Sequence, residues 1–125
     1  MLTEKDYCDY DTSIDLGELG FPLKRMKVRN FIDGQFSDSI VTVLLYEAQK
    51  WLREAKGIFL DIGLFNDGVF YYCIRQKENN YWREIYRSFF HDGLFDDHGK
   101  FKSYEEALSE GIKEAIKILK DGIGE

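Results

Sequence analysis

Residues 58–77 read IFLDIGLFNDGVFYYCIRQK, and this stretch predicts a β-hairpin. Apolar side chains alternate along residues 58–65 and again along residues 69–77, which is the period of a half-buried strand. The turn sequence Asn66-Asp67-Gly68 separates the two runs, and Asp-Gly between alternating runs is a strong signal for a hairpin. We therefore expect two antiparallel strands joined by this turn.

A third strand is expected directly after the hairpin. Glu78-Asn79-Asn80 supplies a turn, and residues 81–90, YWREIYRSFF, follow it as a further strand. Earlier in the chain, residues 24–32 alternate in the same way and end at the turn Asp33-Gly34. These segments predict a mainly antiparallel sheet of about three to five strands, in which the place of the earliest strand stays open.

Two segments, one before and one after these three strands, predict long amphipathic helices. Residues 42–56 carry an apolar stripe, and Gly57 is a suitable residue to end that helix. Residues 104–119 carry a second stripe and follow Ser103, whose hydroxyl is expected to accept from the amide of Glu106 in a capping box.

A short N-terminal helix over residues 9–19 completes the expected elements. Asp9 or Asp11 is the expected cap, and Gly20 ends the helix. Helices and strands in this order indicate an α+β fold with the two long helices packed on one face of the sheet. Because the sequence contains no linker or repeat, we expect a single domain over residues 1–125.

The composition narrows the classes of function. The chain has 125 residues, a net charge of −6 and 16% aromatic residues. The acidic balance argues against binding of duplex nucleic acid, and no run of about 18 apolar residues predicts a membrane helix. Residues 1–6 are too polar for a signal peptide, and Cys8 and Cys73 fit neither a disulfide framework nor a metal knuckle. We expect a cytoplasmic protein with reduced thiols.

The hairpin is expected to turn an aliphatic face toward the helices. That face carries Ile58, Leu60, Ile62, Leu64, Phe70, Tyr72 and Ile74. The opposite face is rich in rings and charges and carries Phe59, Asp61, Phe65, Val69, Tyr71, Cys73 and Arg75. In the third strand, strict alternation sets Tyr81, Arg83, Ile85 and Arg87 on one side and Trp82, Glu84 and Tyr86 on the other. Which of these two sides joins the core stays open, because a slip of one residue inverts every assignment.

The ring-rich face allows three interpretations, of which the first two are compatible. Five of the six arginines fall in predicted strands: Arg25, Arg29, Arg75, Arg83 and Arg87. In a structural interpretation, the arginines pair with Asp61, Glu84 or Glu78 and contribute at most about 1 kcal/mol per cross-strand pair. In the second, the face is an interface between copies of the chain or with another protein, since aromatic residues are enriched there. Its expected interface residues are Phe59, Phe65, Trp82 and Tyr86.

The third interpretation is a site for an anionic, nucleotide-like ligand. Arg75, Arg83 and Arg87 would hold its phosphate through charge-assisted hydrogen bonds. Tyr71 or Tyr81 would stack on its planar base.

Residues 91–98, HDGLFDDH, form the one cluster that resembles a metal site. Their spacing matches neither a calcium loop nor a helical zinc pair, so a solvated loop is the favoured interpretation. Cys73 lies in the middle of a strand with no base beside it in sequence, and we expect a packed thiol. Acidic neighbours, among them Asp9, are expected to raise the pKa of Cys8. No catalytic residue, metal or cofactor is therefore expected.

Three segments of the chain carry a resemblance to a known set of proteins. They are YCDYDTSIDLGELGF at 7–21, YEAQKWLREAKGIFLDI at 46–62 and FKSYEEALSEGIKEAIKIL at 101–119. In this order they resemble small uncharacterised proteins that are common in gut Bacteroidales and in their phages and prophages. The chain departs from their pattern at Gly17, where a helix-forming residue is usual. The resemblance implies no catalytic residues, and its phage association suggests a role in host takeover or counter-defence.

These observations together predict a small non-enzymatic binding protein of mobile-element type. We expect a homodimer that acts through the aromatic face of its sheet, on a host protein or on a second copy of itself. The alternative is capture of an anionic, nucleotide-like molecule. A metal-dependent enzyme that uses residues 91–98 is the least favoured alternative.

Overall fold

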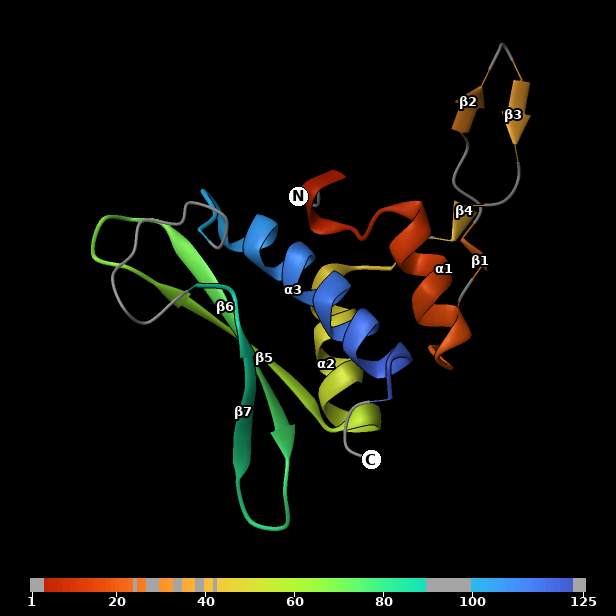
Figure 1. Ribbon diagram of the computed structural model, residues 1–125. Helices are drawn as coiled ribbons and strands as arrows, with labels where there is room; N and C mark the ends of the chain where they lie inside the picture. Colours follow the sequence, from red (N-terminus) through yellow and green to blue (C-terminus); the bar gives the residue numbers. More distant parts are fainter. Residues whose placement is uncertain are drawn as a thin grey trace.

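The hairpin predicted over residues 58–77 forms the centre of a three-stranded antiparallel sheet in the computed structural model of the protein (Figure 1). The strands lie in the order β5 (Ile58–Leu64), β6 (Phe70–Lys77) and β7 (Trp82–Arg87). The predicted turn is confirmed, because Phe65 N donates to Val69 O at 2.8 Å and Gly68 has a φ of 85°. Glycine adopts this left-handed conformation without a steric cost.

The structure describes residues 4–23, 25–26, 30–32, 35–37, 40–41, 43–89 and 100–122. Within these ranges the helical elements are a 3-10 turn η1 (Glu4–Asp6), α1 (Tyr10–Glu18), α2 (Leu45–Lys56) and α3 (Tyr104–Lys120). Helices and an antiparallel sheet in one chain confirm the expected α+β class.

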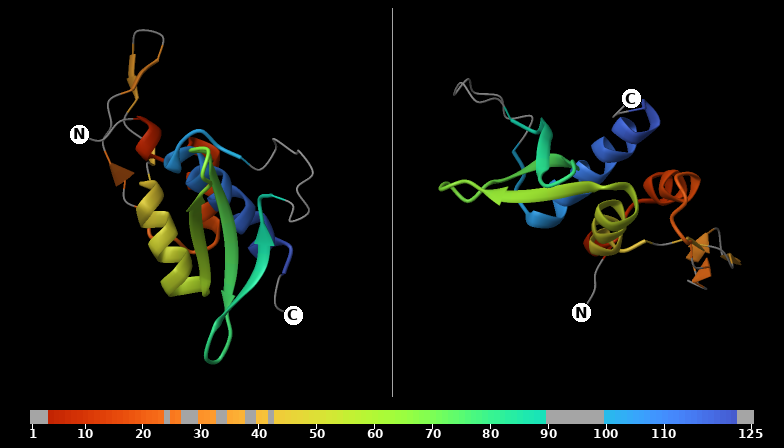
Figure 2. Two further views of the ribbon diagram at one scale, coloured as in Figure 1. Left: turned by 90° about the vertical axis from the view of Figure 1, so that its left-hand side faces the viewer. Right: turned by 90° about the horizontal axis from the view of Figure 1, so that it is seen from below.

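Helices α2 and α3 pack on the aliphatic side of the sheet. α3 lies across β5 and β6, while α2 lies beside β5 and contacts α3 (Figure 2). α3 packs closely on the sheet at Gly111, because a Cβ there would lie 3.1 Å from Leu60 Cδ2 and 3.2 Å from Tyr72 Cγ. The predicted aliphatic face is confirmed at Ile58, Leu60, Tyr72 and Ile74, which lie in one buried core, whereas Leu64 at the far end of β5 is exposed. The same core includes Leu52, Ile112 and Ile116 of the helices.

The predicted capping residues of two helices are confirmed. Asp9, one of the two expected caps, accepts from Thr12 N at 2.8 Å at the start of α1. The hydroxyl of Ser103 accepts from Glu106 N at 3.1 Å at the start of α3. Both bonds satisfy amides that have no partner within the helix.

Gly17 lies inside α1 for a steric reason. A Cβ at this position would lie 2.4 Å from Leu23 Cδ1. The glycine therefore lets residues 21–23 return closely against the helix, although it lowers helix propensity by about 1 kcal/mol relative to alanine.

Two lysines of α3 form ion pairs with α1 and with its capping residue Asp9. Lys113 Nζ lies 3.2 Å from the carboxylate of Asp9. Lys120 Nζ lies 2.8 Å from Asp15 and 3.1 Å from Glu18. Exposed pairs of this kind contribute little to stability, so we expect them to orient α1 more than to hold it.

The long helix predicted over residues 42–56 begins later than expected. α2 starts at Leu45, and Leu44 before it is extended, with φ −68° and ψ 140°. Cys8 N donates to Val43 O at 2.8 Å, so this short stretch pairs with the N-terminal segment instead of starting the helix. The end of the helix is as predicted, since Gly57 is left-handed with φ 66° and its amide bonds to Leu52 O.

The single strand expected over residues 24–32 is divided in the structure. Its described parts are β1 (Arg25–Met26) and β2 (Asn30–Ile32), and neither pairs with the three-stranded sheet. β1 pairs with β4 (Ile40–Val41), and β2 pairs with β3 (Gln35–Ser37). The partner strands β3 and β4 were not predicted, and the turn Asp33-Gly34 lies outside the described residues.

Candidate functional site

The sheet has a second face, opposite α2 and α3, which we call the open face. Among the described residues no helix packs on it. The strand register places Phe59 opposite Arg75, Asp61 opposite Cys73, and Gly63 opposite Tyr71. The open face carries Phe59, Asp61, Gly63, Tyr71, Cys73, Arg75, Lys77, Trp82, Glu84 and Arg87.

A β-bulge in β7 decides which residues of the third strand lie on this face. Arg75 pairs with Glu84, but the preceding Ile74 pairs with Tyr86, so Ile85 is an extra residue on β7. A bulge of this kind reverses the inside–outside alternation beyond it. The strict alternation predicted for residues 81–90 is therefore wrong after Glu84.

The bulge changes which residues of β7 share a face of the sheet. Arg87 lies opposite Cys73, on the same face as Glu84. Arg83 lies opposite Gln76 and therefore on the helix side of the sheet, beyond the helices and exposed to solvent. The three arginines predicted to hold a phosphate thus lie on two different faces.

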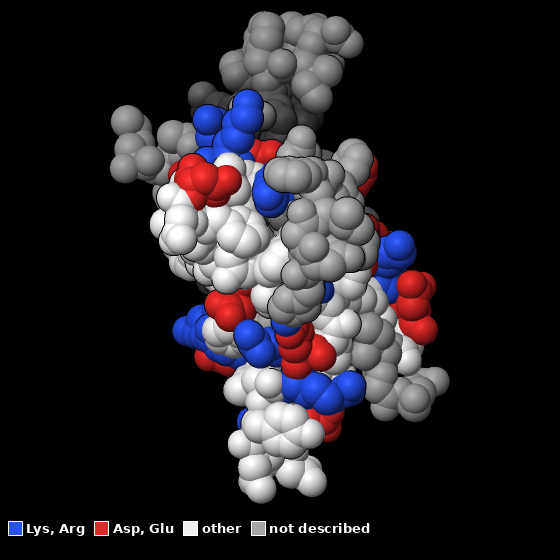
Figure 3. All heavy atoms as spheres, turned by 60° about the vertical axis from the view of Figure 1, so that its left-hand side comes forward, with Lys and Arg blue, Asp and Glu red and all other residues white. Residues whose placement is uncertain are grey.

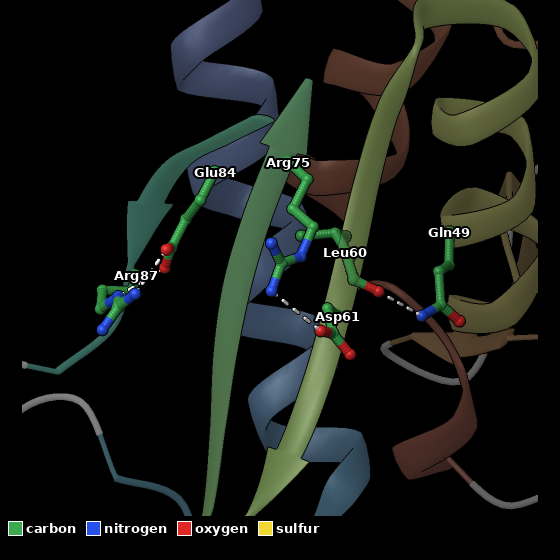
Figure 4. A network of polar contacts seen from close by, with 6 residues as sticks. All are labelled: Gln49, Leu60, Asp61, Arg75, Glu84 and Arg87. Carbon is green, nitrogen blue, oxygen red and sulfur yellow. Dashed lines mark hydrogen bonds and ion pairs between the residues drawn. The ribbon is translucent and has the colours of Figure 1, made fainter. Parts of the chain in front are cut away.

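Each of these three arginines has a carboxylate partner. Arg75 lies 3.6 Å from Asp61, and the guanidinium of Arg87 donates through two nitrogens to the two carboxylate oxygens of Glu84 (Figure 4).

Away from the open face, Arg83 Nε donates to Glu78 at 2.6 Å. Asp61, Glu84 and Glu78 are the expected partners, but Arg87 pairs with Glu84 within β7 and not across strands as expected.

The same charge balance is visible across the surface of the protein. Figure 3 shows basic and acidic atoms of the described residues side by side over the strands, instead of one continuous basic patch. An anion that approached Arg83 or Arg87 would meet a carboxylate hydrogen-bonded to the guanidinium, and at Arg75 it would meet Asp61 at 3.6 Å.

The ion pair of Arg87 with Glu84 also affects the pKa values of Glu84 and of the neighbouring Cys73. Hydrogen bonds from Arg87 hold the pKa of Glu84 below its ordinary value. Burial, followed by the charge of Glu84, raises the pKa of Cys73 to about 11. The thiol is 6% exposed and protonated near neutral pH, as expected for a packed strand cysteine.

The pKa of the other cysteine, Cys8, is also raised. Burial is the first cause that raises the pKa of Cys8 to about 12, and the charge of Asp9 is the second. The sequence predicted the direction from the acidic neighbours, whereas the larger cause is the packing of Cys8 into the core.

An aromatic trio occupies the end of the open face near the β5–β6 turn. Tyr71 lies with its ring centroid 4.6 Å from that of Phe65 and 4.7 Å from that of Phe89. The ring of Tyr71 also lies over Gly63, where a Cβ would be only 2.0 Å from Tyr71 Cζ. Tyr71 is therefore engaged within the protein, and it would have to leave this packing to stack on a ligand.

A second aromatic pair lies toward the opposite end of the same face. The rings of Phe59 and Trp82 are 5.7 Å apart, and the guanidinium of Arg53 lies 5.8 Å from the centroid of Phe59. Tyr81, the other predicted stacking residue, precedes Trp82 at the β6–β7 turn and is 61% exposed.

The predicted interface set is divided by the bulge. Phe59 and Trp82 lie on the open face, and Phe65 packs there against Tyr71. Tyr86 lies on the helix side, where its ring stacks on Tyr72 at 6.0 Å. The sequence contains no signal for this exchange, because the bulge results from packing against β6.

The outer edge of β5 carries a polar contact that the sequence did not indicate. Gln49 Nε2 of α2 donates to Leu60 O at 2.9 Å (Figure 4). A glutamine on the wet side of a helix has many possible partners, so its sequence position alone does not predict this bond.

The remaining predicted site lies outside the described residues. Residues 91–98, which contain the His and Asp cluster, fall within the undescribed range 90–99. Elsewhere in the chain, the described residues contain no group of three or more His, Cys, Asp or Glu side chains placed to hold a metal ion. None of the described helices combines the length and apolar character needed to cross a membrane.

Comparison of the chain with protein-family models, with curated proteins and with solved structures finds no match.

Proposed function

We propose that the protein is a non-enzymatic binding protein that docks another protein on the open face of its sheet. The observation that carries this proposal is a face of half-buried rings on which no described helix packs. Aromatic residues and arginine are enriched in protein interfaces, where rings bury large areas and guanidinium groups stack and donate several hydrogen bonds.

The charges of the open face support a protein partner over a phosphate. Arg75 and Arg87 already bind Asp61 and Glu84, so neither guanidinium offers an unpaired cation. A protein surface can cover such internally paired charges without displacing them. Capture of a nucleotide-like anion gains no comparable support from the geometry.

The resemblance to phage and prophage proteins bears on the kind of partner. Some small phage proteins inhibit a host protein, and host proteins are therefore candidate partners beside a second copy of the chain. In this proposal the protein works in the cytoplasm and carries no cofactor.

A matched pair of variants tests the proposal. F59S/W82S removes the aromatic pair of the open face, while Y46S removes a 57%-exposed tyrosine of α2 that lies outside this face. We expect proteins captured from a bacterial lysate by the wild type to be retained by Y46S and lost by F59S/W82S. Circular dichroism confirms that each variant is folded.

Equal capture by all three proteins would place the docking surface elsewhere. Calorimetric titration with nucleotides addresses the alternative, and we expect no heat of binding. A binding heat that Arg75→Ala abolishes would favour the anion site instead.

A further inference from the structure

The outer edge of β7 differs from the outer edge of β5. Within the described residues β7 pairs with β6 alone, and no side chain bonds to the backbone of Trp82–Arg87 on its outer side. The edge of β5 is instead contacted by Gln49 of α2. An unpaired edge strand is a template for pairing with another strand.

The backbone of β7 is oriented for such pairing. Ser88 N donates to Tyr72 O at 2.9 Å, and Tyr72 N donates to the hydroxyl of Ser88 at 3.0 Å, so Ser88 bonds toward β6. In an antiparallel ladder hydrogen-bonded and non-hydrogen-bonded pairs alternate. The N–H and C=O of the neighbouring Arg87 therefore point away from β6, toward the outer edge.

The sequence of β7 is self-complementary when two copies run antiparallel. If Glu84 of one copy lies opposite Arg87 of the other, two-fold symmetry sets Arg87 of the first opposite Glu84 of the second. The same register sets Ile85 opposite Tyr86 in both directions. The register therefore contains two contacts of Glu84 with Arg87 and two contacts of Ile85 with Tyr86.

The bulge makes this register consistent with the faces of the sheet. Three positions apart on a regular strand, Glu84 and Arg87 would point to opposite faces. The extra residue Ile85 brings both onto the open face, where they form an ion pair within one chain. Residues opposite each other on two paired strands share a face. The ion pair of Glu84 with Arg87 in one chain can therefore be replaced by a pair between Glu84 of one copy and Arg87 of the other.

From this arrangement we infer that the partner of the sheet is a second copy of the chain, which pairs antiparallel along β7 with Glu84 opposite Arg87. The inference goes beyond the proposed function, because it concerns the edge of the sheet and leaves the open face available to another protein. Pairing in this way joins two three-stranded sheets into one, and the two open faces become one continuous surface.

The area buried along β7 indicates how tightly the two copies are expected to bind. Stable protein interfaces bury about 1,200–2,000 Å², and a single six-residue edge buries less. We therefore expect a dimer with a dissociation constant in the micromolar range, of about 1–100 µM.

Charge reversal with cross-rescue tests the register. E84R and R87E each place like charges opposite one another in a homodimer, and each should weaken self-association by about tenfold or more. In an equimolar mixture, the arginine at position 84 of one variant faces the glutamate at position 87 of the other. The unchanged Arg87 of E84R also lies opposite the unchanged Glu84 of R87E, so the mixture should form a heterodimer.

Sedimentation velocity over about 1 µM to 1 mM measures these species. Both variants lack the ion pair within the chain, so rescue in the mixture can only come from contacts between chains. E54R, a reversal at an exposed position of α2, serves as the control and should dimerise like the wild type.

Two results would overturn the inference: a wild type that stays monomeric over this range, or a dimer whose charge-reversed variants are not rescued by mixing. Neither result affects the proposed function, which stands or fails on loss of captured proteins by F59S/W82S.

Discussion

The two faces of the sheet are made by the same three strands but are held together in different ways. On the helix side, aliphatic side chains such as Leu60 and Ile74 are almost completely buried in one continuous core. On the open face, stability comes from separate pairs, such as Arg87 with Glu84 and Phe59 with Trp82. The stability of the helix side therefore depends on how completely its side chains fill the core. The stability of the open face depends on whether each side chain keeps its one partner.

The largest effect is expected from a cavity on the helix side. Ile74 is 0% exposed, and Ile74→Ala should lower the free energy of unfolding by about 2–5 kcal/mol. Leu64→Ala is the matched control, because Leu64 belongs to the same face but is 61% exposed, and its loss should cost less than about 1 kcal/mol. Urea denaturation measures both values. Similar costs for the two variants would contradict a core confined to the helix-covered part of this face.

A steric change on the open face should have a smaller effect. Gly63→Ala places a methyl group against the ring of Tyr71 and should destabilise the protein by about 1–3 kcal/mol. In a Tyr71→Ala background the same change meets no ring, so its additional cost should largely disappear. Additive costs in the double variant would show that the packing of Tyr71 over Gly63 does not hold in solution.

The smallest effect concerns the ion pair and its pH dependence. Because the pKa of Glu84 is lowered in the folded state, its pairing stabilises the protein above the pKa of an unfolded glutamate. This contribution is lost as the pH falls through the lowered folded-state pKa. Thermal unfolding of wild type and Glu84→Gln should therefore differ at pH 7 and converge at acidic pH. A difference that grows on acidification would have the wrong sign.

Local signals in the sequence predicted the parts of the fold that depend on neighbouring residues. The turn at Gly68, the cap at Ser103 and the left-handed Gly57 are each set by the chemistry of a few adjacent positions. The two faces of the hairpin were also predictable, because an alternating apolar pattern has only one arrangement that buries it.

Features that depend on distant partners were not predictable in the same way. The bulge at Ile85 arises from the register between β7 and β6, and the late start of α2 arises from the pairing of Val43 with Cys8. For the site, the partners Asp61, Glu84 and Glu78 of the arginines were foreseen. The faces of Arg87 and Tyr86 were not, since alternation carries no information about an inserted residue.

The bond from Gln49 to Leu60 O has a consequence for growth beyond two molecules. A sheet with two free edges can add copies at both sides and lengthen without limit, whereas symmetric pairing through one edge closes after a single step. Because Gln49 of α2 occupies the Leu60 carbonyl, this edge of β5 is less available for pairing with another strand. This bond would favour a finite pair over a fibre.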